Sequence, residues 1–121
     1  MKTVFLYQIA HGRSGDKGDA VNVGIIARKP EFYEFIGQTL TPERVKSHMG
    51  QMVAGEVIRY DLPNLHAYNF ILNNALGGGG TMSLQLDAQG KTYAAALLKM
   101  KVEVPEEWEV MPWPQKSAEK Q

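Results

Sequence analysis

The chain has 121 residues, of which 44% are hydrophobic and 21% charged, the size and composition of a single globular domain. Its thirteen basic and thirteen acidic side chains cancel, so it lacks the basic excess of proteins that bind nucleic acid. It has no cysteine, which excludes thiol nucleophiles, disulfides and thiolate metal sites and suits a reducing cytoplasm, the location we expect.

The first part of the chain is predicted to form two strands around a polar loop. Residues 3–10 are rich in β-branched and aromatic side chains, and they predict a buried strand rather than a signal peptide, because the apolar run is short and leads into charged residues. Residues 21–28 predict a second strand. No apolar run reaches the roughly 18 residues of a membrane span, so we expect no membrane association.

Two helices are expected next. Pro30 suits the first turn of a helix, with Glu31 and Glu34 near its positive end. Thr41 can cap a second helix, because Pro42 follows it at the first helical position. Residues 56–62 then predict a third strand, and their alternation leaves open which face is buried.

The second half of the chain contains two segments whose periodicity is less decisive. Residues 63–80 predict a helix capped by Asn64, because apolar residues recur near helical spacing and Gly77 offers a C-terminal cap. Residues 82–104 predict a hairpin with its turn at 87–90, because alternate positions from Ala94 to Val104 are apolar. A short helix over 92–100 is the alternative, since alanine favours helices.

These elements, in the order β-β-α-β-α-β-β, predict an α+β two-layer sandwich. Its sheet would be antiparallel or mixed, with about five strands and with helices on one face. The domain would span residues 1–105. Because a small sandwich leaves a sheet face or edge uncovered, we expect a homo-oligomer.

Residues 106–121 are expected to form a tail, disordered over its last six or so residues. Four of its side chains are too apolar to remain in water: Trp108, Val110, Met111 and Trp113. We expect them to cover the chain's own core rather than to dock on a partner subunit.

Residues 11–19, HGRSGDKGD, raise the main functional question. Their three glycines could turn backbone N–H groups toward an anion, and Arg13 or Lys17 could add charge-assisted hydrogen bonds. The spacing matches neither a Walker A loop nor the dinucleotide fingerprint, and the carboxylates are too few for a calcium loop. A solvated turn whose charges pair locally remains the alternative.

The remaining polar signals are weaker. His66 could act as an acid or base, although a structural histidine is more common. The three histidines lack the close spacing of zinc motifs, so we expect no metal site. Ser14 lies beside His11 and Asp16, but neighbours on a loop do not define a catalytic triad. The glycines at 77–80 would let a ligand or neighbouring chain approach the backbone, or would only cap and connect.

Four segments together resemble the small C-terminal domain of the acyclic terpene utilisation proteins, the AtuA-like family. The motif RSGDKGD and the pair Asn69–Phe70 followed by LGGG at 76–79 are specific in combination. The resemblance covers about residues 5–105. The segments are AHGRSGDKGDAVNVGIIAR, LTPERVKSHM, RYDLPNLHAYNFILNNALGGG and SLQLDAQGKTYAAALLKMKVEVP.

The resemblance implies a ferredoxin-like domain and a connection to the catabolism of terpenoid or other branched acids as acyl-CoA thioesters. Because a much larger domain precedes this one in full-length family members, we expect a standalone subunit or one half of a split protein with a larger AtuA-type partner. By motif match, the implied signature site comprises Arg13, Ser14, Gly15, Asp16, Lys17, Gly18, Asp19 and Asn22. A second implied group comprises Asn64, Asn69, Gly77, Gly78 and Gly79.

Three hypotheses about function follow, and whether the chain is an enzyme stays open. The leading one is an accessory subunit that binds an acidic metabolite or a CoA thioester through Arg13 and Lys17, with no cofactor of its own. The second is a small lyase or hydratase with Asp16, Asp19 or His66 as general base. The third is a structural module whose glycines and tryptophan-containing tail bind a large partner.

Overall fold

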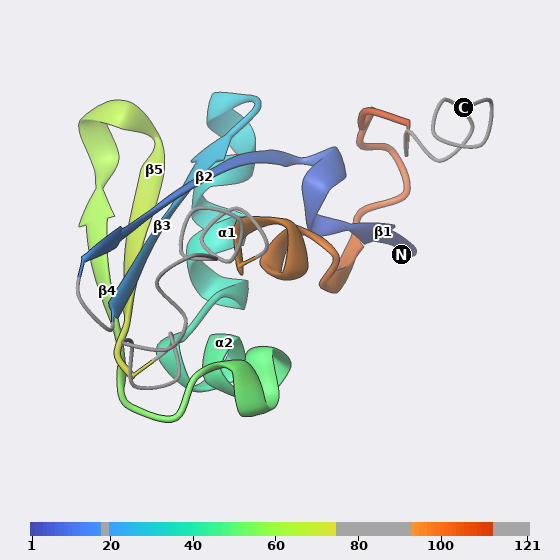
Figure 1. Ribbon diagram of the computed structural model, residues 1–121. Helices are drawn as coiled ribbons and strands as arrows, with labels where there is room; N and C mark the ends of the chain where they lie inside the picture. Colours follow the sequence, from blue (N-terminus) through green and yellow to red (C-terminus); the bar gives the residue numbers. More distant parts are fainter. Residues whose placement is uncertain (18–19, 75–92, 113–121) are drawn as a thin grey trace, which may run out of the picture.

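The computed structural model describes residues 1–17, 20–74 and 93–112. Four antiparallel strands form the main sheet in the order β2–β3–β5–β4, and a separate two-stranded sheet pairs β1 with β6 (Figure 1). The strands are β1 (Lys2–Phe5), β2 (Ala10–Lys17), β3 (Ala20–Ala27), β4 (Val57–Leu62), β5 (Ala67–Leu72) and β6 (Lys101–Val104).

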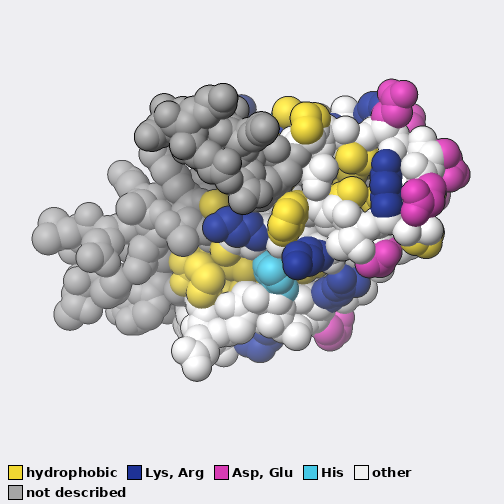
Figure 2. All heavy atoms as spheres, turned by 90° about the vertical axis from the view of Figure 1, so that its right-hand side faces the viewer, with side chains coloured by type: hydrophobic (Ala, Val, Ile, Leu, Met, Phe, Trp, Pro, Cys, Tyr) yellow, Lys and Arg dark blue, Asp and Glu magenta, His cyan; other side chains and the backbone are white. Residues whose placement is uncertain are grey.

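Helices α1 and α2 and the helical residues 93–98 lie on one side of the main sheet, to its right in Figure 1. Seen from that side, charged side chains of both signs are spread over the surface, with acidic ones gathered toward one edge (Figure 2). Among the described residues, no helix is long and apolar enough to cross a membrane. The helical segments are η1 (Leu6–Gln8), η2 (Pro30–Phe32), α1 (Tyr33–Thr39), α2 (Pro42–Met49), η3 (Gly50–Met52), η4 (Pro63–Leu65) and residues 93–98.

This arrangement confirms the predicted α+β architecture with helices on one face, although the strands form two sheets instead of one. The core lies between the main sheet and the helices. Alternate residues of β3 and β5 are fully or almost fully buried there, and cross-strand pairing aligns them: Val21 with Leu72, Val23 with Phe70 and Ile25 with Tyr68. The residues between them lie on the opposite face of the sheet, as the period of two in a strand requires.

The helices begin where the sequence signals place them. Pro30 opens η2, which continues directly into α1. The Arg44 N–H donates to Thr41 Oγ1 at 3.1 Å, so Thr41 caps α2 and Pro42 is its first residue, as predicted. These helix starts can be predicted from sequence because a capping hydrogen bond joins residues within one turn of each other.

The predicted polar loop at 11–19 is wrong over most of its length. Residues 11–17 belong to β2, which pairs with β3 in continuous register from Ala10–Ala27 to Lys17–Ala20. Glycine has low strand propensity, but the ladder with β3 overrides it. The first predicted strand, 3–10, is also interrupted. It ends at Phe5, and η1 precedes β2, with the Phe5 N–H donating to Gln8 Oε1 at 2.9 Å.

The predicted helix at 63–80 is wrong over its described part. Only η4 is helical, and β5 follows it as an interior strand between β3 and β4. Tyr68, Phe70 and Leu72 alternate with less buried residues, a period of two that the wider helical spacing concealed. Asn64 is an exposed residue within η4 and caps no α-helix. Gly77 lies outside the described residues.

The predicted strand at 94–104 is correct only at its end. Residues 93–98 are helical, as in the alternative interpretation, and β6 occupies 101–104. Tyr93, Ala94 and Leu97 are buried at helical spacing, and the Tyr93 hydroxyl donates to the Met52 carbonyl at 2.6 Å. The rest of the proposed hairpin, including its turn at 87–90, falls outside the described residues.

The start of the tail packs on the chain's own core, as expected. The Trp108 ring lies 4.7 Å from Phe32 and 5.4 Å from Phe35, measured between centroids, and Val110 also packs against the core. The Lys2 ammonium donates to the Trp108 carbonyl at 2.7 Å. Met111, in contrast, is 39% exposed. Trp113 and the end of the tail lie outside the described residues.

Arg59 of β4 ties the sheet to α1. Its Nη1 donates to the carbonyls of Gly37 at 2.6 Å and Leu40 at 3.0 Å. Its Nε and Nη2 donate to the two carboxylate oxygens of Asp61 at 2.9 and 3.3 Å. The side chain therefore satisfies carbonyls at the end of the helix that would otherwise lack an intrahelical donor.

Tyr68 of β5 lies beneath the same helix. Its ring stacks on Tyr33 with centroids 4.6 Å apart, and its hydroxyl donates to the Tyr33 carbonyl at 2.8 Å. Burial, and secondly a side-chain hydrogen bond with Tyr33, raise the pKa of Tyr68. A Cβ at Gly37 would collide with the Tyr68 hydroxyl. The helix can approach the sheet this closely only because residue 37 has no side chain.

We expect Gly37→Ala to lower the free energy of unfolding by about 1–3 kcal/mol, the usual cost of overpacking a core. The loss cannot come from helix propensity, because alanine is the better helix former. Urea denaturation measures it, with Gly15→Ala as control because a Cβ at Gly15 meets nothing within 4 Å. Equal stability of the two variants would contradict the close contact.

We expect Trp108→Ala to lower the free energy of unfolding by about 2 kcal/mol, less than for a fully buried aromatic because the ring is partly exposed. Thermal or urea denaturation checks the value, with the neighbouring exposed residue varied as Glu107→Ala for comparison. An unchanged midpoint for Trp108→Ala would show that the tail does not stabilise the domain.

Candidate functional site

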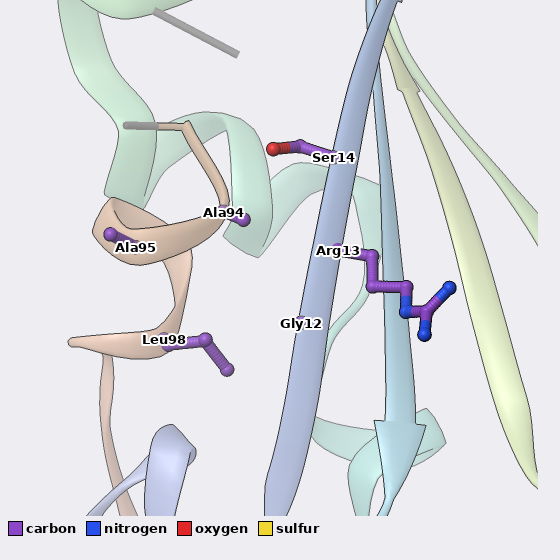
Figure 3. Close-up of a pocket in the computed structure, with 6 residues that line it drawn as sticks. All are labelled: Gly12, Arg13, Ser14, Ala94, Ala95 and Leu98. Carbon is purple, nitrogen blue, oxygen red and sulfur yellow. The ribbon is translucent and has the colours of Figure 1, made fainter. Parts of the chain in front are cut away.

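The signature residues of β2 alternate between the two faces of the sheet. Gly12 and Ser14 pair with the buried Ile25 and Val23 and therefore lie on the helix-covered face. Arg13 lies on the other. Figure 3 shows Ser14 directed toward the helical residues 93–98 and Arg13 directed away from them. The structure thus divides the predicted site into two surfaces.

The helix-covered surface holds a pocket of about 430 Å³ between β2 and residues 93–98. It is mainly apolar, and Ser14 supplies a hydroxyl to it (Figure 3). A Cβ at Gly12 would lie 2.9 Å from Leu98 Cδ1, so the glycine permits close packing of the helix on β2. Arg13 is the one ionisable residue of the pocket's described lining, and its side chain points away from the pocket (Figure 3). Its described lining residues are Gly12, Arg13, Ser14, Ala94, Ala95 and Leu98.

The opposite surface, here named the open face, is the side of the main sheet that no described helix covers (Figure 1). Register and alternation place three residues of each strand on it. They are His11, Arg13 and Gly15 of β2, Asn22, Gly24 and Ile26 of β3, Ala67, Asn69 and Ile71 of β5, and Ile58, Tyr60 and Leu62 of β4.

A row of four residues crosses the centre of the open face. Pairing aligns Arg13 with Gly24, Gly24 with Asn69, and Asn69 with Tyr60. Arg13 is exposed and makes no hydrogen bond or ion pair with any other described residue. Asn69 Oδ1 lies 3.9 Å from the position that a Gly24 Cβ would take. The glycine therefore leaves space between a cation on one side and an amide on the other.

An apolar groove of about 300 Å³ continues from this row. Gly24 and Asn69 belong to both, and Leu62 and Leu65 form much of its apolar wall. Leu65, held out by η4, is 65% exposed and Leu62 is 38% exposed. The volume is at the lower end of those of small-molecule sites. The groove can hold a small apolar group whose polar end reaches Asn69 and Arg13.

Basic groups gather at the β2 edge of the open face. The Arg28 Nη1 lies 3.4 Å from His11 Nε2, while its Nε donates to the Tyr7 carbonyl at 2.8 Å and its guanidinium lies 4.6 Å from the Tyr7 ring centroid. Partial burial, followed by the charges of Arg28 and Arg13, lowers the pKa of His11. The cluster favours an anion, because a bound negative charge would relieve this repulsion.

The remaining predicted site residues are dispersed or undescribed. Asn22 and Asn69 share the open face with Arg13 and Gly15, whereas His66 sits at the exposed end of η4 with a left-handed backbone, φ 50°. Asp16 and Lys17 belong to β2, at the positions paired with Val21 and Ala20. Outside the described residues lie Gly18, Asp19, Gly77, Gly78 and Gly79.

Several residues of the open face escape the sequence-based prediction, notably Gly24, Tyr60 and Leu62. The alternation of residues 56–62 predicts a strand with two distinct faces, but it does not show which of the two faces is buried. Among the described residues, no group of three histidine or acidic side chains could hold a metal ion.

We expect Arg13→Ala to raise the pKa of His11 toward its ordinary value of 6.5, because one of the cations that repel its charged form is removed. Since the folded-state pKa is the lower one, the histidine lowers stability only as the pH falls below 6.5. Titration of the His11 ring by NMR measures the change. Lys99→Ala removes an equal charge on the helix side and should leave it unaltered.

Comparison with known families identifies the chain. The AtuA ferredoxin-like domain family matches residues 4–103, most of its length and nearly the span of the resemblance described above. No curated protein and no solved structure shows significant similarity. Because the match covers more than half of the sequence and the α+β architecture agrees with it, the chain belongs to the AtuA ferredoxin-like domain family.

Proposed function

We propose that the chain is an accessory subunit that binds a branched acid or its CoA thioester in a terpenoid-type catabolic system, together with a larger AtuA-type subunit. The observation that carries this proposal is the continuity on the open face between the Arg13 side chain and the apolar groove. The family's connection to acyclic terpene utilisation supports the choice of ligand class, and a cytoplasmic location accompanies it.

The polar end of such a ligand suits the Arg13 side of the row. A carboxylate or CoA phosphate would accept charge-assisted hydrogen bonds from the guanidinium, which has no described acidic partner. The side-chain amide of Asn69 lies beside the space left by Gly24, with its Oδ1, a hydrogen-bond acceptor, nearest to that space. Asn22 lies on the same face in the adjoining row. Arg28 adds positive potential at the same edge.

The apolar end suits the groove beside Leu62 and Leu65. Both side chains are unusually exposed for leucines, and covering them with a branched alkyl chain removes apolar area from water. A methyl branch fits a groove bounded by Gly24, Ile26 and Ala67, which are small or β-branched. The groove favours a ligand with an alkyl chain over a free phosphate, because a free phosphate would contact only the cationic side chains.

Of the three candidate bases of the lyase or hydratase alternative, His66 is the one whose side chain the structure describes. His66 is exposed on η4, and its ring makes an edge contact with Tyr33 at 5.8 Å between centroids. The ligand-binding proposal therefore assigns no proton transfer to this chain and leaves the chemistry to its larger partner.

The test is isothermal titration calorimetry with isovaleryl-CoA, isovalerate and CoA. We expect Arg13→Ala to weaken isovaleryl-CoA binding roughly 10- to 100-fold, the equivalent of one charge-assisted hydrogen bond of about 1.5–3 kcal/mol. Lys99→Ala serves as the charge-matched control. Leu65→Ala should weaken isovaleryl-CoA more than CoA. Wild-type affinity in the Arg13→Ala variant would refute the proposed site.

A further inference from the structure

Several large apolar side chains on the open face are exposed. Tyr60 is 53% exposed, and Leu62 and Leu65 lie beside it at 38% and 65%. Ile58 and Ile71 are only partly buried, and no described helix covers this face of the sheet (Figure 1). A contiguous patch of this kind marks an interaction surface.

The register of the strands gives this surface a definite pattern of three rows, each read from β2 to β4. The central row is Arg13–Gly24–Asn69–Tyr60. The flanking rows are His11–Ile26–Ala67–Leu62 and Gly15–Asn22–Ile71–Ile58.

Three of the six pairs formed between a row and its own reverse join a small residue to a larger one. A second copy related by a two-fold axis parallel to the strands would lay each row over its reverse, because the axis exchanges the β2 and β4 edges. Gly24 would then face Asn69, Ala67 would face Ile26, and Gly15 would face Ile58. Each row thus contains one pair of a small and a larger residue, which favours close packing of the two sheets at those positions.

Charge favours the same orientation. It places Arg13 of one copy opposite Tyr60 of the other, where a guanidinium can lie on the aromatic ring. A two-fold axis perpendicular to the strands would instead place Arg13 on Arg13 and Gly24 on Gly24, which combines like charges with a void. Packed sheets cross at an angle of about 30°, and the arginine side chain is long enough to reach Tyr60 of the other copy at that angle.

The second copy would also complete the ligand site. Within one chain Arg13 and Tyr60 lie three strand spacings apart, roughly 14 Å at about 4.8 Å per strand, too far to act on one ligand group. Across the dimer they would be neighbours. The Tyr60 hydroxyl could then donate a hydrogen bond to the acyl or carboxylate oxygen held by Arg13. Because the second sheet would cover Ile26 and Ala67, the acyl chain would lie against Leu65, the exposed groove residue outside the three rows.

We infer that the chain forms a two-fold dimer through the open face, with each ligand site built from Arg13 of one copy and Tyr60 of the other. This inference rests on the proposed function for the identity of the ligand. The dimer itself follows from the pattern of the three rows.

Sedimentation equilibrium tests the dimer without ligand. We expect a dimer for the wild type, dissociation for Leu62→Lys, and an unchanged dimer for Met111→Lys. The two substituted side chains are matched in exposure, 38% and 39%, but Met111 lies outside the open face. Circular dichroism confirms that Leu62→Lys remains folded. A wild-type monomer, or a Leu62→Lys dimer, would overturn the inference and leave the open face to a larger subunit.

A mixing experiment tests the shared site, with isovaleryl-CoA as the probe. We expect Arg13→Ala and Tyr60→Ala each to weaken binding at least tenfold. After the two variants exchange subunits, about a quarter of the sites should regain wild-type affinity, because each mixed dimer contains one intact Arg13–Tyr60 pair. Tyr60→Phe keeps the ring and isolates the contribution of the hydroxyl.

The outcomes separate the two proposals. Loss of binding in both variants without recovery on mixing would place the site within one chain, overturning the shared site while the proposed function stands. Loss only in Arg13→Ala would have the same meaning. Wild-type affinity in both would refute the ligand site, whereas sedimentation would still report on the dimer independently.

Discussion

The guanidinium of Arg59 is the interaction on which the two-layer arrangement depends. It joins β4 to the end of α1 through two carbonyls and is itself fixed by Asp61. Its guanidinium lies 4.8 Å from the centroid of the Tyr68 ring. A charged group can be held here only because each of these partners satisfies it. Arg59 and Tyr68 both face α1, so they hold this helix on the side of the sheet whose apolar residues are buried.

The part of the fold that sequence reasoning predicted is the part governed by local chemistry. Thr41 and Pro42 mark a helix start whatever the rest of the chain does, and the alternating strand from Val21 needs no distant partner to be recognised. The errors occur where distant contacts decide. Residues 11–17 are glycine-rich and polar, yet β3 recruits them as an edge strand. Residues 67–72 fit a helical spacing, but they form a strand that pairs with β3 and β4 on either side, and in a strand every second side chain lies on the same face.

The residues of the candidate site likewise divide into those that could be predicted from sequence and those that depend on distant contacts. Arg13, Asn22 and Asn69 are recognisable as polar residues of the family motifs, and the structure places them on one face. Ser14 belongs to the same motif but lies on the opposite face, because neighbours in a strand point in opposite directions. Tyr60 and the exposed leucines could not be assigned from sequence, since their role depends on which strand lies beside them and on which face is covered.

The pairing of β1 with β6 has a consequence for the order in which the protein folds. Lys2 pairs with Val104 and Phe5 with Lys101, so this sheet joins segments that are nearly a whole domain apart in sequence. During synthesis β1 emerges first and has no partner strand until β6 follows, while the hairpin of β2 and β3 can form from neighbouring residues at once. Contacts of such long sequence separation close late. The main sheet can therefore form before β1 and β6 pair, and the β1–β6 sheet forms last.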